Sequence, residues 1–387
     1  MPSIKILHSI AEAPVDLFLH SPSPFLSRAF WLALENCGAV SSERGWWAQH
    51  LLLLDDEEQA MALLPLFIKN HSRGEYVFDH AWAQAYANNG LDYHPRLVSA
   101  VPFTPVAGPR MWLMAGVCLN DALPFLLHGI QHIAEQLNAS SWHGLFLEAQ
   151  DAAVFQQSDM PLALRYGCQF LWTDQGFGDF DGFLATMTAK RRKNIKAERA
   201  KIARAGISCT FIEGADIDTT DWAFFYTCYE RTYHIRGQRP YLNQAFFEQL
   251  GKDMPQQLTL QIAQQANGDR LAAALFFKDD QTLYGRYWGA VEDVDCLHFE
   301  VCYYQGISYA LIHRLRYFDP GTQGEHKLLR GFSPVYTQSL HWLRDEQFMR
   351  AVQLYVEREQ LGVSAYHEEA CAALPFKKTH PIEHGPI

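Results

Sequence analysis

Hydrophobic and polar positions alternate in strand-like and helix-like patterns along the first half of the chain. Two apolar segments, 46–54 and 60–68, flank the turn-like DDEEQ, and this pattern predicts an antiparallel hairpin. Apolar residues recur at three- and four-residue steps in 25–37 and 123–138, which predicts two helices. The run WHGLFLE at 142–148 predicts another strand.

Two further segments of the first half follow no simple period. Residues 73–90 are aromatic and irregular. Downstream, Pro102, Pro105 and Pro109 break a strand in LVSAVPFTPVAGPRMWL, because proline cannot donate a hydrogen bond to a strand ladder. We therefore expect a shaped loop at these prolines.

The second half predicts a regular succession of helices and strands. The segment DFDGFLATMTAKRRKNIKAERAKIARAG predicts a long helix or helix pair that closes at Gly206, since glycine suits the left-handed helix cap. Residues 221–234 are helical in pattern, because Trp222, Phe225 and Tyr229 recur at helical steps. The other predicted elements are strands at 207–213, 258–264, 270–278, 282–290 and 325–332, and helices at 244–252, 299–317 and 344–359.

These elements together indicate an α+β protein with two lobes. At roughly 150 residues per domain, a chain of 387 residues favours two or three domains. The order helix, hairpin, helix, strand occurs in both halves, which favours two copies of one fold over two unrelated α/β lobes. We place the lobes at 1–178 and 179–387, each with a mixed, mostly antiparallel sheet flanked by helices.

Charge is distributed unevenly along the chain. The formal net charge of −11 argues against general coating of nucleic acid. The segment 190–204, KRRKNIKAERAKIAR, nevertheless gathers basic residues. On a helix, Arg192, Lys196 and Arg199 would share one face. That face either binds an anionic partner, such as a nucleotide-linked sugar diphosphate, CoA or tRNA, or is a solvated amphipathic surface.

Targeting and redox signals are weak. No run approaches the ~20 apolar residues of a membrane span, and the first residues lack the pattern of a signal peptide. We therefore expect a cytoplasmic protein without a membrane span. The eight cysteines form no CxxC pair, which favours reduced core cysteines over a disulfide framework or a zinc ribbon.

The strand, strand, helix, strand order within 270–332 is the arrangement that an acyl-transfer site of the GNAT type needs. In such a site two adjacent strands part, and a carbonyl oxygen binds main-chain N–H groups in the gap. The following helix directs its N-terminus at the phosphates of a cofactor. Many α+β folds share this order, so further signals are needed.

Longer sequence blocks supply such signals. In the first lobe these are LPLFIKNHSRGEYVFDHAWAQAY, from Leu64, and YHPRLVSAVPFTPVAGPR, from Tyr93. In the second lobe they are KRRKNIKAERAKI, PYLNQAFFEQL, LYGRYWGA, LHFEVCYYQGISYALIHRL, PGTQGEHKLLRGFSPV and SLHW. With these blocks the chain resembles the FemAB-like branch of the GNAT superfamily over most of its length. The resemblance implies two GNAT-like lobes and transfer of an acyl or aminoacyl group to an amine of a small molecule or cell-wall precursor.

The resemblance leaves two activated donors open. Acyl-CoA-dependent members usually carry a Q/R-x-x-G-x-G/A loop before the helix, and here the comparable region reads YYQGISYA. Gln305 and Gly306 are the candidates for cofactor binding, although their spacing departs from that loop. Acyl-CoA is the favoured co-substrate, with no covalently bound cofactor. Aminoacyl-tRNA, the donor of peptidoglycan Fem transferases, is the alternative.

Glu300 is the first candidate for the base that takes a proton from the attacking amine, and His326 is the second. A neutral histidine or a carboxyl with a raised pKa suits that task. The alternatives are a helix N-terminal carboxylate for Glu300 and a structural histidine for His326. Together with His298 and Glu325, the pair offers ligands for a metal. Their spacing matches no metal motif, and we expect no metal.

Basic and aromatic residues of the second lobe are candidates for binding. Lys327 and Arg330 resemble the lysine-bearing final strand of Fem transferases, where it faces donor or acceptor phosphates; a solvated strand face is the alternative. Arg286 and Tyr287, in YGRYWG, lie on the strand expected to part from its neighbour. Arg286 either clamps a carboxylate or phosphate of the substrate or forms a structural ion pair.

Asp79 and His80, in FDHAW, are first-lobe candidates for binding the acceptor, and aromatic core packing is their alternative explanation. The expected reaction is direct attack of an amine on a thioester or ester, with no covalent enzyme intermediate. Two rivals stay open: an enzyme of the same fold that uses aminoacyl-tRNA, and a non-catalytic module that binds a glycan or cell-wall precursor.

Overall fold

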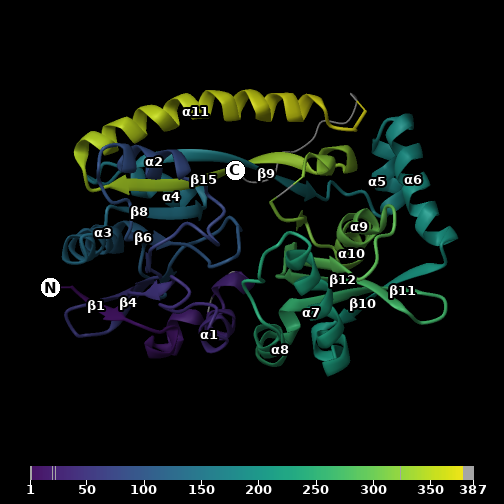
Figure 1. Cartoon of the computed structure of the whole chain (residues 1–387), viewed down its shortest axis with the longest axis horizontal. Helices are drawn as coiled ribbons and strands as arrows, with labels where there is room; N and C mark the ends of the chain where they lie inside the picture. Colours follow the sequence, from purple (N-terminus) through teal and green to yellow (C-terminus); the bar gives the residue numbers. More distant parts are fainter. Residues whose placement is uncertain (1, 20, 22, 323, 378–387) are drawn as a thin grey trace. The chain divides into compact units, whose positions relative to one another are not determined.

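The computed structural model describes residues 2–19, 21, 23–322 and 324–377 (Figure 1). It forms two compact units. Unit 1 consists of Met1–Gly167 and Tyr336–Ala365, and unit 2 of Cys168–Val335 and Tyr366–Ile387. The sequence analysis divided the chain once, after residue 178. The structure divides it at three points, because two long strands and the last helix each continue from one unit into the other.

Unit 1 begins with a four-stranded antiparallel sheet in the order β1-β3-β4-β7. The hairpin predicted at DDEEQ forms the centre of this sheet, where Leu51 pairs with Leu64. The strands are β1 (Ser3–Leu7), β3 (His50–Leu54), β4 (Ala60–Leu64) and β7 (Trp112–Leu113).

A second group of strands in unit 1 has the order β15-β8-β6-β5-β2. Most neighbours are antiparallel, but β6 and β8 are parallel and pair from Leu97↔Trp142 to Ser99↔Gly144. The strands are β15 (Ser333–Leu343), β8 (Ser141–Leu147), β6 (Arg96–Ser99), β5 (Phe67–Lys69) and β2 (Trp47–Ala48).

Helices bury one face of these strands in a continuous apolar core. Ser27 caps the first long helix by accepting from the Phe30 N–H. Trp142 stacks on Phe155 inside the core, and both are at most 1% exposed. The helices of unit 1 are α1 (Arg28–Asn36), α2 (His80–Asn88), α3 (Leu119–Gln136), α4 (Ala149–Gln156) and the first part of α11 (Glu346–Ala372), with short turns η1 (Ile10–Glu12), η2 (Val15–Phe18) and η3 (Pro24–Leu26).

Unit 2 is built on one sheet in the order β10-β11-β12-β13-β14-β9. The pairs are antiparallel except for β13 with β14, which run parallel. The strands are β10 (Ile207–Glu213), β11 (Leu258–Gln265), β12 (Arg270–Lys278), β13 (Thr282–Ala290), β14 (Tyr317–Asp319) and β9 (Ala163–Thr173).

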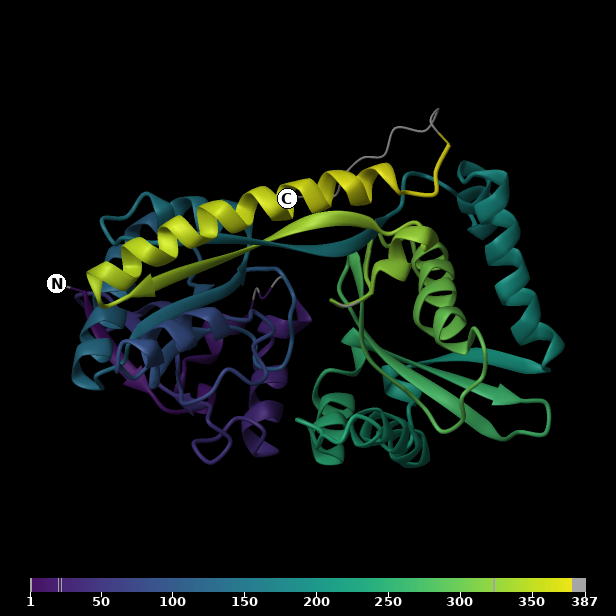
Figure 2. The ribbon, with the colours of Figure 1, turned by 45° about the horizontal axis from the view of Figure 1, so that its top comes forward.

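Helices lie on both faces of this sheet (Figure 2). The helices α7 (Thr219–His234) and α8 (Gln244–Asp253) cover one face, and α10 (Gln305–His313) covers the other. Asp218 and Asp221 form a capping box that starts α7. The other helical elements are α5 (Phe180–Thr186), α6 (Ala189–Arg204), η4 (Gly214–Asp216), η5 (Pro255–Gln257), α9 (Leu297–Phe299), the π-helical turn η6 (Glu300–Tyr304) and η7 (Glu325–Arg330).

One predicted element is wrong. The segment 325–332 forms the 3-10 helix η7 instead of a final strand. Gly324 and Gly331 bracket it with φ of 105° and 87°, where side chains are disfavoured, so the chain curls into a turn between them. The strand follows only at β15.

The other predicted elements are confirmed with shifted bounds. The helix expected at 299–317 is α9, η6 and α10 in succession and ends at Arg314, which has φ of 58°. Both units contain a strand, helix, parallel strand crossover: β6, α3 and β8 in unit 1, and β13, α9–α10 and β14 in unit 2. The predicted α+β class with two similar lobes is confirmed.

Candidate functional site

The parallel strands β13 and β14 part from each other in unit 2. They pair only at Thr282↔Tyr317, Leu283↔Phe318 and Tyr284↔Asp319. Beyond this point β14 ends, and residues 285–290 of β13 continue without a strand on that side within the described part of the chain. The two strands therefore part at the carboxyl end of β14, where an acyl-transfer site was expected, and we call this point of divergence the gap.

A charged pair lies at the start of this gap. The register of β12 against β13 shifts so that Arg286 is an extra residue between Gly285 and Tyr287, which is a β-bulge. Arg286 donates two hydrogen bonds to Asp319, at 2.6 and 3.1 Å. The Arg286 side chain is 3% exposed and that of Asp319 is 14% exposed. The geometry is bidentate and orients both groups.

Lys327 adds a second cation to the same place. Its ammonium donates to the Gly321 carbonyl oxygen at 2.5 Å, and the residue is 1% exposed. Burial lowers the pKa of Lys327 to about 8, while Asp319 opposes this shift and Arg286 adds to it. The lysine is therefore still mostly protonated at neutral pH, and the gap carries two cations against one carboxylate.

His326 precedes this lysine on η7 and is half-buried. Its Nε2 lies 2.8 Å from the Tyr303 hydroxyl of η6. Burial lowers the pKa of His326, and the charges of Arg330 and Lys327 add to the effect. The imidazole is consequently neutral at physiological pH, as a general base must be. His298 packs beside it, with ring centroids 5.9 Å apart, and burial lowers the pKa of His298 to about 4.

Glu300, the other predicted base, is held in an ion pair. It accepts from Arg199 of α6 at 3.1–3.3 Å and from the Gln305 side chain at 2.7 Å. Its side chain is 5% exposed, and that of Arg199 is 30% exposed. All three residues line a cavity of about 380 Å³ whose other walls are mainly apolar. Glu300 thus fastens α6 to the π-helical turn.

The structure gives Gly306 a packing role. A methyl group at this position would lie 2.5 Å from ring atoms of Phe318 on β14, so α10 approaches the strand closely only because residue 306 is glycine. The loop before α9 is also unlike a phosphate-binding loop. It carries Glu292, Asp293 and Asp295, all exposed, where a diphosphate would meet negative charge.

Arg330 and Tyr287 are likewise occupied by protein groups. Arg330 donates to both carboxylate oxygens of Glu198, at 2.8 and 3.0 Å, and lies 3.4 Å from the ring centroid of Phe299. It also donates to the His326 carbonyl oxygen at 2.8 Å, which fixes η7. Tyr287 is 9% exposed and packs in an aromatic cluster with Tyr229 of α7.

The basic helix α6 forms where predicted, with Ile195 and Ile202 on its buried side. Lys196 pairs with Asp181 at 3.0 Å on the surface. Arg192 is half-buried one turn before it. These two predicted binding residues therefore lie on the partly solvated face of one helix.

Asp79 and His80 lie in unit 1, in different environments. Asp79 is 3% exposed and receives hydrogen bonds from Tyr93 at 2.6 Å and from Ser72 at 3.0 Å, beside an ion pair with Arg96 at 2.5 Å. Arg96 holds the pKa of Asp79 below its ordinary value against the opposing effect of burial. His80 is exposed and stacks on Phe78.

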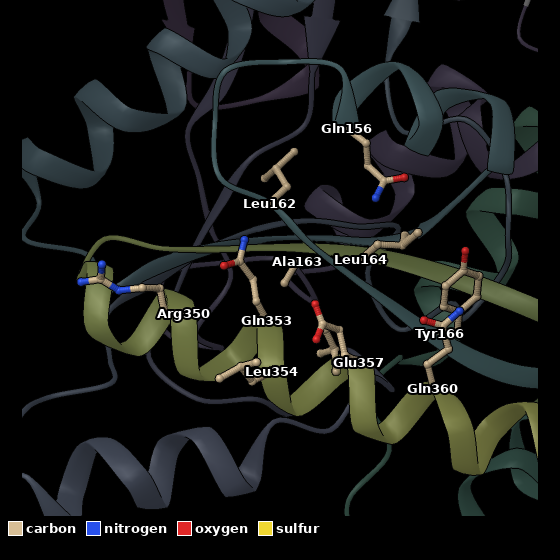
Figure 3. A pocket seen from close by; sticks show the side chains of 11 residues that line it. Gln156, Leu162, Ala163, Leu164, Tyr166, Arg350, Gln353, Leu354, Glu357 and Gln360 are labelled. Carbon is tan, nitrogen blue, oxygen red and sulfur yellow. The ribbon is translucent and has the colours of Figure 1, made fainter.

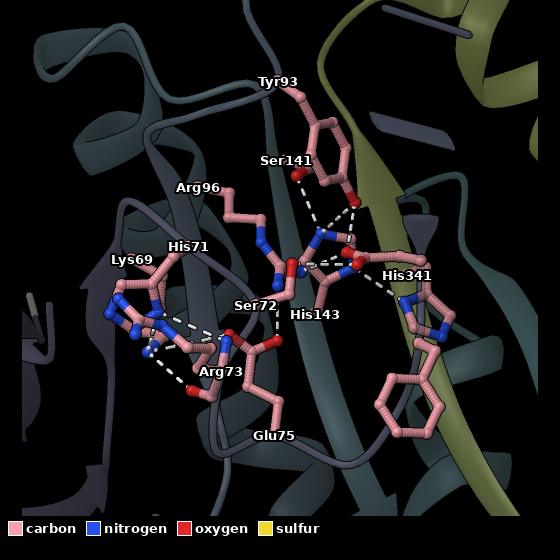
Figure 4. A network of polar contacts seen from close by, with 12 residues as sticks. Lys69, His71, Ser72, Arg73, Glu75, Tyr93, Arg96, Ser141, His143 and His341 are labelled. Atoms are coloured by element: carbon pink, nitrogen blue, oxygen red, sulfur yellow. Dashed lines mark hydrogen bonds and ion pairs between the residues drawn. The ribbon is translucent and has the colours of Figure 1, made fainter. Parts of the chain in front are cut away.

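Asp79 belongs to a larger buried network (Figure 4). Nδ1 of His143 on β8 lies 2.7 Å from Nδ1 of His341 on β15, and the Tyr93 hydroxyl is within 3.3 Å of His143. Burial lowers the pKa of both histidines well below 6.5, so they are neutral. The network cross-links strands of unit 1 and leaves little room for a ligand, since its side chains are almost fully buried.

The corresponding gap of unit 1 is filled by the chain itself. After Ser99 the parallel pair β6–β8 ends, and the proline-containing loop turns back so that Gly108 donates to the Phe146 carbonyl at 3.1 Å. Arg110, 3% exposed, donates to the carbonyls of Leu145 at 2.6 Å and Phe146 at 2.5 Å. Burial lowers its pKa to about 9. In unit 1 the proline-containing loop and Arg110 therefore occupy the place where β6 and β8 part.

Sequence reasoning missed several residues that complete the site. Asp319 ends a short strand directly before Pro-Gly, and a polar residue at a strand's carboxyl end was the available signal. Tyr303 and Glu198 gave no signal, because their partners lie 23 and 132 positions away in the chain.

Two findings concern metals and membranes. The side chains that the structure describes include no group of three His, Cys, Asp or Glu arranged to hold a metal ion. Among helices within the described ranges, none combines the length and apolar character that a bilayer-spanning segment requires.

Several solved structures of low sequence identity align with this chain. FemX aligns with a TM-score of 0.52 and 12% identity, over 90% of this chain and 100% of its own. L-PGS from Bacillus licheniformis aligns with a TM-score of 0.49 and 11% identity, over 87% and 96% of the two chains. A tandem GNAT protein from the clavulanic acid biosynthesis pathway gives 0.44 and 11%, over 88% and 98%. The similarity to FemX shows a shared fold.

Sequence comparison shows which family the chain belongs to. No curated protein has significant sequence similarity to this chain. The model of the FemAB-like family, described as peptidoglycan biosynthesis/recognition, matches residues 6–378. Since this match takes in nearly the whole chain, the protein belongs to the FemAB-like family.

Proposed function

We propose that unit 2 catalyses transfer of an acyl or aminoacyl group from an activated donor to an amine of a small molecule or cell-wall precursor. The observation that carries this proposal is the gap between β13 and β14, with Arg286, Asp319 and Lys327 at its base and a neutral His326 nearby. Family membership and the two-lobed fold agree with it.

The donor carbonyl lies in the gap beside residues 285–290 of β13. Main-chain N–H groups there donate to the oxyanion as it develops, an effect often worth about 3–4 kcal/mol per donor. Arg286 and Lys327 carry two positive charges, and Asp319 carries one negative charge. The net positive charge further favours the oxyanion. The acyl group is thus bound by the edge of a strand that the fold leaves without a neighbour.

His326 is the base in this scheme. When its Nε2–H donates to the Tyr303 hydroxyl oxygen, the lone pair of Nδ1 is left to accept a proton. The amine nitrogen attacks the carbonyl carbon, the new C–N bond forms, and the amine proton moves to Nδ1. The C–S or C–O bond of the donor then breaks, and the imidazolium returns the proton to the departing thiolate or alkoxide. No covalent enzyme intermediate is required.

Glu300 is the alternative base. It lines a cavity together with Arg199, but its carboxylate oxygens already accept hydrogen bonds from that guanidinium and from the Gln305 amide. We assign Glu300 to positioning the π-helical turn that carries Tyr303. This assignment leaves His326 as the group that moves the proton.

Acyl-CoA is the donor that we favour, because the net charge of −11 disfavours association with tRNA. Aminoacyl-tRNA is the second candidate. Two observations favour it: the acidic loop at Glu292, Asp293 and Asp295, which disfavours a diphosphate before α9, and the basic face of α6. The third candidate is a recognition module that binds a precursor without turnover. We expect the reaction in the cytoplasm, where such precursors and donors are made.

Mass spectrometry of an amine acceptor separates these candidates. A lysine-containing cell-wall precursor is incubated with the protein and either acetyl-CoA or a charged tRNA. An acceptor that gains the acyl mass with acetyl-CoA supports the favoured donor, and a gain only with tRNA supports the second. Saturable precursor binding with no product from either donor would reject the transferase and leave the recognition module.

A further inference from the structure

A groove in unit 1 lies beside the edge of β9. It has a volume of about 600 Å³ and runs between the start of β9 and the first part of α11 (Figure 3). The strand wall is residues 162–166, and the helix wall is residues 350–360. We name it the β9 groove.

The strand wall of the β9 groove is an unprotected sheet edge. In the strand order β9 lies between β14 and β15, but β14 reaches it only at Trp172 and Thr173. Residues 163–167 therefore have no strand neighbour on that side within the described chain. Proline, lysine or a bulge usually guards such an edge. Here the only charged residue of 163–167, Arg165, pairs with Glu359 of α11 at 2.6 Å and does not line the groove.

The dimensions of the β9 groove suit an extended chain. Four steps of strand at about 3.3 Å span roughly 13 Å. Ten residues of helix at about 1.5 Å span roughly 15 Å. The two walls therefore match in length, and the β9 groove between them is as long as about four residues of extended peptide.

Side chains on the helix wall offer hydrogen bonds without strong net charge. Gln353 and Glu357 point from α11 toward β9, and Gln156 faces them from α4 (Figure 3). Leu164 and Tyr166, two positions apart on the strand, supply apolar contacts on one strand face. The charges of the Arg350 guanidinium and the Glu357 carboxylate balance each other, which disfavours a phosphate-rich ligand.

Arg350 lies at one end of the groove, level with the start of β9, and Tyr166 lies at the other end (Figure 3). The Arg350 side chain is 69% exposed, and its ion pair with Glu346 is long, at 3.8 Å. A peptide that runs antiparallel to β9 would bring its carboxyl end to Arg350. A free carboxylate there would gain a charge-assisted hydrogen bond.

We infer that the β9 groove binds an extended peptide of about four residues, which adds as an antiparallel strand to the edge of β9 with its C-terminal carboxylate at Arg350. This peptide site goes beyond the transfer chemistry, and it stands whether or not unit 2 is a transferase. The main-chain hydrogen bonds supply affinity for any sequence, and the pockets for alternate side chains select among sequences.

Fluorescence anisotropy with a randomised tetrapeptide mixture, labelled at its N-terminus, tests the inference on the full chain. We expect saturable binding, weakened at least about tenfold by Glu357→Trp, which fills the groove. Arg358→Trp is the matched control, since Arg358 is exposed on the same helix but outside the groove. Arg350→Gln should remove the preference for a free over an amidated C-terminus.

Hydrogen exchange of residues 162–167 supplies the second readout. Strand addition predicts that the mixture slows exchange of amides in this segment. The inference is overturned if the mixture does not bind below about 1 mM, if both tryptophan variants bind alike, or if binding leaves these amides unchanged. Binding of N-acetylglucosamine tetrasaccharide in place of the peptides, blocked by Glu357→Trp, would instead identify a glycan site.

Discussion

His326 and Glu300 are both acid–base side chains of unit 2, but their partners give them different chemistry. The neutral His326 has a hydroxyl partner and a free ring nitrogen. The carboxylate of Glu300 is paired with the guanidinium of Arg199. The sequence identified both candidates from their residue types. It ranked Glu300 first, because the ion pair could not be foreseen: Arg199 is 101 positions from Glu300 and only the folded chain brings the two together.

Exchange of each candidate separates their roles. His326→Asn keeps a polar side chain but removes the base, so we expect kcat/KM for transfer to fall about 100-fold or more. Glu300→Gln keeps acceptors for Arg199, so we expect less than about a tenfold loss in kcat/KM, with some loss of stability from the weaker hydrogen bond. Steady-state kinetics and urea unfolding measure both effects. Full turnover by His326→Asn would refute the assigned base.

The pH dependence of transfer follows from the pKa of His326. Burial, Arg330 and Lys327 all lower this pKa below the ordinary value near 6.5. Only the unprotonated imidazole can accept the amine proton, so kcat/KM should rise with pH through an apparent pKa below about 6.5. It should fall again as Lys327, with its pKa of about 8, loses its positive charge. An inflection well above about 6.5 in the acid limb, or its persistence in His326→Asn, would assign the limb to another group.

At the scale of elements, periodicity located most helices and strands because burial enforces it. The predicted bounds of β10 and β13 agree with the structure. The segment at η7 failed because its apolar residues sit between two glycines with positive φ, and a period of two cannot express that constraint. The strand β9 was not predicted, because residues 164–168 are only half-buried and follow no alternation of apolar and polar residues.

Two glycines in helices test how closely α10 must approach β14. At Gly306 a methyl group would strike Phe318, which Phe276 and Phe332 hold in the core. We expect Gly306→Ala to lower the free energy of unfolding by about 1–3 kcal/mol. At Gly362 of α11 nothing lies within 4 Å.

The control variant Gly362→Ala should therefore raise the free energy of unfolding by about 0.5–1 kcal/mol, because alanine costs less chain entropy in a helix. Urea unfolding of the two variants measures both values. Equal effects of the two substitutions would mean that Phe318 yields and that the close approach is not a constraint.

At the scale of the whole molecule, the two units share a crossover of parallel strands but differ in what lies where those strands part. Arg110 and the proline-containing loop fill the gap in unit 1. The sequence predicted the two lobes and the loop. It could not show that the loop fills the gap, because the carbonyl partners of Arg110 lie on β8, 35 and 36 residues away.

Donor binding at the gap of unit 2, and not at the filled one of unit 1, sets the expected stoichiometry. Native mass spectrometry with the donor that supports transfer should show one donor per chain, and Asp319→Asn should weaken binding by releasing Arg286 from its fixed orientation. Two donors per chain, with equal affinity, would show that the filled gap of unit 1 opens in solution.

Hydrogen exchange with the same donor tests the central claim most directly, namely that the parted end of β13 binds the activated acyl group. If the parted end of β13 binds the acyl group, the amides of residues 285–290 should exchange more slowly when donor is added. The amides of residues 100–110 of unit 1 should be unchanged. Donor binding that leaves residues 285–290 unaffected, or that protects only the loop of unit 1, would contradict it.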